Sequence, residues 1–159
     1  VYDLPNHLDE KFDIVFTSYG TIGWLPDLDK WASVIDNHLK PGGQFIFAEF
    51  HPVVWMFDDD FTKIQYKYDK SDAIVETEIG TYTDGGETLS TECVSWNHSL
   101  SEVMTSLIKQ GIEIVQFEEF DYSPYACFSH VEQVGEGKFR IKHLGDKIPM
   151  VYSLVGVMK

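Results

Sequence analysis

The sequence is poor in basic residues and has no long apolar run. Lysine and arginine together number 12, against 26 aspartate and glutamate residues, so the formal net charge at pH 7 is −14. A charge of this sign and size repels duplex nucleic acid and anionic membrane surfaces. No run approaches the roughly 18 apolar residues that a membrane span needs. Neither nucleic acid nor a membrane is therefore an expected partner.

Cysteine is also scarce. Cys93 and Cys127 are the only two in the chain, so they can form at most one disulfide, and their spacing has no zinc-ligand pattern. The first residues carry neither the basic segment nor the apolar segment of an export signal. We therefore expect a cytoplasmic protein without a metal site.

Apolar and aromatic side chains are plentiful. Hydrophobic residues make up 43% of the chain and aromatic residues 14%, which is enough for a core and excludes disorder as the dominant state. The length of 159 residues fits one domain or part of one. Because Val1 begins a stretch that is typical of a loop, we expect residues 1–159 to be the downstream part of a single domain.

The first 50 residues have the pattern of a strand, a helix and a second strand. Residues 13–18 and 44–50 are short apolar runs, each typical of a strand buried on both faces of a parallel sheet. Between them, Asp27 is a good N-cap, and the apolar positions of residues 28–39 keep helical spacing. Residues 40–43, Lys-Pro-Gly-Gly, end the helix. We expect the two strands to be adjacent and parallel.

Residues 61–96 change to the alternation of antiparallel strands. Alternating side chains at 64–68, 75–79 and 89–93, with a turn signal at 84–86, predict a small meander inserted after the second strand. We expect it to leave the main sheet and to cover a crevice or a partner chain, since isolated strands need a surface to pack on. This leaves a homodimer through the insertion open.

The remainder predicts a second helix and two further strands. Residues 99–102, Ser-Leu-Ser-Glu, form a capping box for a helix that Gly111 ends. Strands are expected at 112–117 and 150–158, separated by an aromatic loop and a glycine-rich turn at 135–137. The whole pattern indicates an α/β fold.

Three segments carry a resemblance to a known family. They are residues 12–19 (Phe-Asp-Ile-Val-Phe-Thr-Ser-Tyr), 39–43 (Leu-Lys-Pro-Gly-Gly) and 45–49 (Phe-Ile-Phe-Ala-Glu). In this order they resemble the second half of a class I S-adenosylmethionine-dependent methyltransferase. The resemblance implies the C-terminal part of a doubly wound, Rossmann-like sheet, here with an antiparallel β insertion.

The resemblance also implies S-adenosylmethionine as the cofactor. Val1 and Tyr2 are similar to the family's adenine edge, while Thr17, Ser18 and Tyr19 are similar to the positions that meet the methionine end. The family's glycine-rich loop has no counterpart in this chain, which contains no G-x-G-x-G. We therefore expect the 159 residues alone to bind the cofactor weakly or not at all, and a chain extended upstream to bind it. An ordinary strand end remains the alternative for Thr17 and Ser18.

Ligands of doubly wound sheets bind beyond the carboxyl ends of the parallel strands, which here are followed by polar residues. His51, just past the second strand, is the candidate catalytic base, with Glu49 beside it. The alternative for His51 is a turn cap before Pro52. His98, which precedes the second helix, is a candidate substrate residue or part of a helix cap.

Aromatic residues follow the same strands. Trp24, Trp55 and Tyr125 are candidate substrate-binding residues, since aromatic rings attract an amine or a sulfonium. Packing in a core or an interface is the alternative.

The leading hypothesis is a methyltransferase that acts on a small-molecule acceptor by in-line displacement, in which alignment provides most of the catalysis. The alternative is a non-catalytic binding or oligomerisation module that keeps half of the fold. A nucleic-acid methyltransferase fits poorly with the acidic charge. It also fits poorly with Phe-Thr-Ser-Tyr at residues 16–19, where an Asn/Asp-Pro-Pro-aromatic tetrapeptide would be expected.

Overall fold

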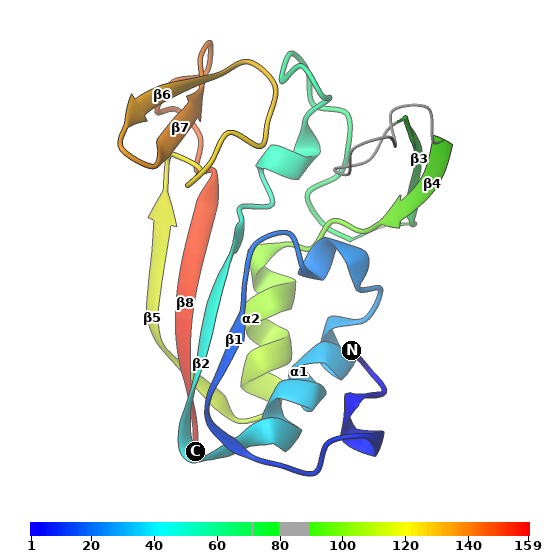
Figure 1. Ribbon diagram of the computed structural model, residues 1–159, viewed down its shortest axis with the longest axis vertical. Coiled ribbons are helices and arrows are strands. Elements are labelled where there is room, and N and C mark those ends of the chain that lie inside the picture. The colour runs from blue at the N-terminus through cyan, green and yellow to red at the C-terminus, as the bar shows by residue number, and fades with distance from the viewer. Residues whose placement is uncertain (71, 80–89) are drawn as a thin grey trace.

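The computed structural model describes residues 1–70, 72–79 and 90–159 (Figure 1). Its main sheet has four strands in the order β1-β2-β8-β5. These are β1 (Phe12–Thr17), β2 (Leu39–Phe50), β8 (Val151–Met158) and β5 (Ile112–Phe120). β1 and β2 are parallel and β8 is antiparallel to both of its neighbours, which confirms the predicted α/β class and the parallel pair.

Helix α1 (Leu28–His38) connects β1 to β2. The side chain of Asp27 caps it by accepting a hydrogen bond from the Lys30 amide at 3.0 Å. The ring of Trp31 packs on those of Phe45 and Phe47, with centroid distances of 5.6 and 5.3 Å. The helix ends at His38, one residue before the predicted end at Leu39, and β2 begins at Leu39. Residues 40–43, which were expected to form a turn, therefore belong to the start of β2, where its pairing with β1 is irregular.

Helix α2 (Leu100–Lys109) begins and ends as the sequence predicts. The Ser99 hydroxyl accepts the Glu102 amide hydrogen at 3.4 Å, and Gly111 has a φ of +81°, a left-handed conformation that glycine adopts without a steric penalty. No helix in the described part of the chain is long and apolar enough to cross a membrane.

Both helices lie against one face of the main sheet (Figure 1). Their apolar sides meet the core-facing residues of β2, β8 and β5, including Phe45, Phe47 and Leu154, which are fully buried. On β1, however, Ile14 and Phe16 are 56% and 61% exposed. The prediction that β1 is buried on both faces is therefore wrong, because no described element covers β1 on the side of Ile14 and Phe16.

The insertion is a hairpin, and the predicted three-segment meander is wrong in one part. β3 (Ile74–Ile79) and β4 (Ser90–Ser95) pair antiparallel in a separate two-stranded sheet, as predicted. Residues 64–68 form no strand, since only Ile64 makes an isolated bridge, to Phe57. The predicted turn at 84–86 and the start of the last segment at 89 lie outside the described residues.

A third small sheet closes the carboxyl end of the main sheet, and its strands were not predicted. β6 (Val131–Gly135) and β7 (Lys138–Ile141) form a hairpin around the predicted glycine-rich turn. Together with the segment that contains the short helix η3 (Val54–Met56), they enclose a second apolar cluster, centred on Phe50, Phe61 and Ile141.

The buried carboxylate of Glu49 fixes the loop that follows β1. Oε1 accepts the amide hydrogens of Gly20 at 2.6 Å and Phe50 at 2.7 Å. Oε2 accepts those of Thr21 at 2.8 Å and Ile22 at 3.3 Å. Burial raises the pKa of Glu49, and the four N–H groups act in the opposite direction. One side chain of β2 thus holds the whole turn from β1 into the short helix η2 (Ile22–Trp24).

Replacing Glu49→Gln is expected to lower the free energy of unfolding by about 2–4 kcal/mol, because a glutamine amide nitrogen cannot accept and two buried N–H groups lose their partner. Urea denaturation measures the loss, and amide exchange should accelerate at Gly20 and Thr21. The control is Glu113→Gln, since Glu113 is exposed beside Lys159. Equal stability of the two variants would contradict this role.

Gly156 allows β8 and β5 to pack closely. A Cβ at this position would lie 2.4 Å from Cγ2 of the buried Ile112, a branched methyl that cannot rotate away. Gly156→Ala should therefore cost about 1–3 kcal/mol of stability in urea denaturation. Gly23→Ala is the matched control, because a Cβ there has no neighbour nearer than 3.9 Å; a loss as large in the control would show that the close approach is not the cause.

Candidate functional site

The residues between β1 and η2 occupy the carboxyl end of the parallel pair, where doubly wound sheets bind ligands. Ser18 is exposed and Tyr19 is half-buried. The Tyr19 ring contacts Phe50, the last residue of β2, at a centroid distance of 5.7 Å, and Tyr125 at 6.2 Å. The structure therefore brings together one predicted cofactor residue and one predicted substrate residue.

Val1 and Thr17, both predicted cofactor residues, line one small hollow of about 180 Å³ beside β1. The other lining residues are mostly apolar and come from β1, α1 and the first turn of the chain. Tyr2 lies on the α1 side, where its hydroxyl accepts the Asp27 amide hydrogen at 2.8 Å and donates to the Asp27 carbonyl at 3.0 Å. Tyr2 thereby fixes the first residues of the chain to the start of α1.

Two of the three predicted aromatic substrate residues meet around Phe50. Trp55 and Tyr125 lie 5.6 and 6.0 Å from the Phe50 ring centroid. Trp24 is exposed in η2 and, among the described aromatic residues, makes no ring contact with this group. The sequence could not separate the three, because their meeting depends on how the loop of residues 121–130 folds over the sheet.

His98 is not available to a substrate. Its side chain is 1% exposed, with Nε2 at 2.9 Å from the Leu25 carbonyl oxygen and Nδ1 at 3.0 Å from Glu102 Oε2. One ring nitrogen thus contacts the first turn of α2 and the other contacts the residue after η2, so the ring connects these two elements. The predicted substrate role is replaced by the helix-cap alternative.

His51 is also held on both sides. Its Nδ1 accepts the Val53 amide hydrogen at 3.2 Å, which places the proton of the neutral ring on Nε2. Nε2 lies 2.9 Å from Glu119 Oε1 but off the direction of a good hydrogen bond, so this contact is mainly electrostatic. Burial lowers the pKa of His51, and the Glu119 charge opposes that change. The ring has no unused lone pair with which to act as a base.

Glu49 and Glu119 flank the same buried phenol. Tyr152 of β8 pairs with Glu49 of β2 on one side and with Glu119 of β5 on the other. Its hydroxyl has no partner among the described residues, and burial raises its pKa well above the ordinary value. Glu49 is 2% exposed, which gives it a positioning role in place of the predicted catalytic one, whereas the Glu119 side chain is 47% exposed.

Sequence reasoning missed Glu119 and Tyr152, although a signal was present. Near the carboxyl ends of β2 and β5 every second side chain faces the helices. The last two on that side are Phe47 and Glu49 on β2, and Phe117 and Glu119 on β5. In each strand the apolar series ends in a polar residue at the same edge of the sheet. Tyr152 occupies the corresponding place at the start of β8.

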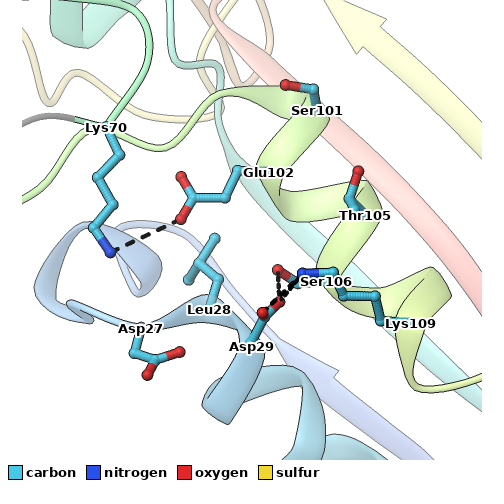
Figure 2. Close-up of a pocket in the computed structure, with 9 residues that line it drawn as sticks. All are labelled: Asp27, Leu28, Asp29, Lys70, Ser101, Glu102, Thr105, Ser106 and Lys109. Atoms are coloured by element: carbon cyan, nitrogen blue, oxygen red, sulfur yellow. Dashed lines mark hydrogen bonds and ion pairs between the residues drawn. The ribbon is translucent and has the colours of Figure 1, made fainter.

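A groove with a volume of about 420 Å³ lies elsewhere, between the start of α1 and α2 (Figure 2). Four of its five charged residues form pairs with one another: Asp29 accepts from Lys109 at 2.8 Å, and Lys70 lies 4.0 Å from Glu102. Asp29 also accepts from the Ser106 hydroxyl at 2.9 Å. These contacts connect the two helices, so we assign the groove a structural role. The described residues contain no group of three or more metal-ligating side chains.

Neither a protein-family model nor a curated protein matches this sequence. Solved structures do resemble it. A protein described as an S-adenosylmethionine-dependent methyltransferase from Listeria monocytogenes is 15% identical, with a TM-score of 0.56 over 94% of this chain and 62% of that chain. A protein described in the same way from Clostridium acetobutylicum ATCC 824 is 15% identical, with a TM-score of 0.54 over 96% of this chain and 60% of that chain.

The glycopeptide N-methyltransferase MtfA, solved with S-adenosylmethionine bound, is 14% identical, with a TM-score of 0.50 over 96% of this chain and 56% of that chain. This chain thus spans less than two thirds of the length of each of these proteins. At such identities the likeness establishes the fold. Over the part that it shares with them, the chain has the fold of the S-adenosylmethionine-dependent methyltransferases.

Proposed function

We propose that this fold serves S-adenosylmethionine-dependent methyl transfer to a small-molecule acceptor. The observation that carries the proposal is the loop of residues 18–22, fixed by Glu49 at the carboxyl ends of two parallel strands and placed beside exposed aromatic rings. In sheets of this kind that edge is where cofactors and substrates bind. MtfA, whose structure contains S-adenosylmethionine, shares the fold.

The residues present fit the cofactor in part. The hollow lined by Val1 and Thr17 is mostly apolar and suits a flat adenine ring. Ser18 offers an exposed hydroxyl, and the adjoining loop offers a backbone that is already rigid, which reduces the entropy lost on binding an amino-acid group. We assign Val1, Tyr2, Thr17, Ser18 and Tyr19 to this cofactor surface.

When bound, S-adenosylmethionine supplies a methyl group on a positively charged sulfur. The protein's part in an in-line displacement is mainly to align the acceptor with that methyl group. Trp55 and Tyr125 provide the acceptor side. Glu119, whose side chain is 47% exposed and lies 2.9 Å from His51 Nε2, is a carboxylate at this edge of the sheet, on the face of Glu49 and Tyr152.

A non-catalytic binding or oligomerisation module is the second candidate. The exposed apolar residues Ile14 and Phe16 on β1, and the exposed cross-strand pair Val75 and Val94 on the β3–β4 hairpin, favour it. A module of this kind would associate through these surfaces and would not bind the cofactor. Sedimentation velocity and the following titration separate the two candidates.

Titration of ¹⁵N-labelled protein with S-adenosylhomocysteine should shift the amide signals of Ser18, Tyr19 and Tyr2, because these residues form the proposed cofactor surface. The amides of β6 and β7 should stay unchanged. Amide shifts detect binding even at millimolar dissociation constants, so weak binding still gives a result. Shifts confined to other regions, or none at saturating ligand, would contradict the proposal.

His51 should titrate below its ordinary pKa of about 6.5, since burial disfavours the imidazolium. A folded-state pKa below the unfolded value means that stability falls as the pH drops below about 6.5, because the unfolded chain binds more protons. His51→Asn should remove this part of the pH dependence. NMR titration of the ring and urea denaturation at pH 5 and pH 7 measure both effects; a His51 pKa above 6.5 would restore the ring as a candidate base.

A further inference from the structure

Five aromatic side chains form a continuous surface beside the fixed loop of residues 18–22. Phe50 is its centre, and its ring centroid lies between 5.1 and 6.0 Å from those of four others. All four of these contacts are edge-on or tilted, so the rings stand around Phe50 instead of stacking flat on it. We call this group the aromatic shelf; it consists of Tyr19, Phe50, Trp55, Tyr125 and Phe128.

The rim of the aromatic shelf is open. Phe50 is buried, but Trp55 is 41% exposed and Tyr125 is 46% exposed. Each of these two contacts Phe50, and they come from segments far apart in the sequence: η3, and the loop between β5 and β6. Apolar rings at a rim that adjoins a proposed cofactor surface are suited to hold a ligand.

The charge around the aromatic shelf selects the sign of that ligand. Residues 51–63 and 118–130, which supply Trp55, Tyr125 and Phe128, contain six carboxylates, two histidines and a single lysine or arginine, Lys63. Arg140 of β7 pairs with one of these carboxylates, Asp121, at 2.5 Å. His51 and His130 lie 2.9 and 3.0 Å from two others, Glu119 and Asp60, so three carboxylates are in no ion pair among the described residues. The negative potential of these segments adds to the electron-rich faces of the rings, and both attract a cation. A cation already uses an aromatic face nearby, where Lys138 Nζ lies 4.7 Å from the Tyr122 ring centroid.

We propose that the aromatic shelf binds an organic cation, and that the methyl acceptor is an amine. The second part rests on the proposed methyl-transfer function, whereas the first part stands without it. A neutral apolar ligand would gain nothing from the surrounding carboxylates, and an anion would be repelled by them. An ammonium ion with alkyl substituents gains from both the rings and the charge.

Transfer to such an acceptor balances in two steps. The bound ammonium first releases a proton to water or to a carboxylate at the open rim, which leaves a lone pair on nitrogen. That lone pair then forms the new N–C bond while the C–S bond breaks, and its electron pair goes to sulfur. The product is a methylated ammonium ion and the neutral thioether, so the ligand on the aromatic shelf remains a cation after transfer.

The test compares choline with 3,3-dimethylbutan-1-ol, a neutral molecule of nearly the same shape. Amide-shift titrations on the whole chain should give choline a dissociation constant at least about 5-fold lower than that of the alcohol. Trp55→Leu and Tyr125→Leu should each weaken choline binding about 5-fold, and Trp55→Phe, which keeps a ring, should weaken it less. Phe12→Leu is the matched control, because Phe12 lies at the opposite end of β1, and it should leave choline binding unchanged.

The outcomes separate this proposal from the proposed function. Equal binding of choline and the alcohol would overturn a cation site, and that comparison needs no variant. Choline-induced shifts confined to Val1, Tyr2 and Ser18, with none at Trp55 and Tyr125, would place the cation in the cofactor surface and would also overturn the proposal. If choline binds as expected while S-adenosylhomocysteine causes no shifts, the aromatic shelf stands and the methyl-transfer function fails.

Discussion

The carboxylate of Glu49 is the constraint on which this end of the molecule depends. Four backbone N–H groups converge on it, three of them from the turn after β1. Buried N–H groups without a partner are costly, so this turn and β2 are stable only in one relative position. That position sets where Tyr19 points, and Tyr19 in turn contacts the rings of Phe50 and Tyr125.

Local signals in the sequence predicted most of the main sheet and both long helices. The caps at Asp27 and Ser99 and the left-handed Gly111 depend only on neighbouring residues, and the structure confirms all three. The apolar run of β1 also predicted a strand correctly, but the exposure of Ile14 and Phe16 depends on what packs against them. Continuous hydrophobicity identifies a strand that can be covered on both sides, and it contains no information on whether the cover is present.

The short hairpin of β6 and β7 shows the opposite limit. Its strands are five and four residues long, and neither alternates strictly between buried and exposed side chains, so they lack the pattern that identifies a half-buried strand. In the site, local reasoning placed His51 and His98 near the correct edge of the sheet. It could not show that their ring nitrogens are occupied, because the partners Glu119 and Leu25 lie 68 and 73 residues away in the chain.

Glu49 and Phe50 are consecutive residues of β2, and the pleat of the strand sends their side chains to opposite faces. Glu49 fixes the turn after β1, and Phe50 supports the aromatic rings. The position of a single peptide unit therefore determines where the turn and the rings lie. A shift of β2 by one residue that brought Glu49 to the place of Phe50 would put a carboxylate among the rings and the methyl group of Ala48 where the turn after β1 needs an acceptor. Any sequence change that alters the pairing of β2 with β1 or β8 therefore acts on both surfaces at once, and neither can drift in evolution independently of the other.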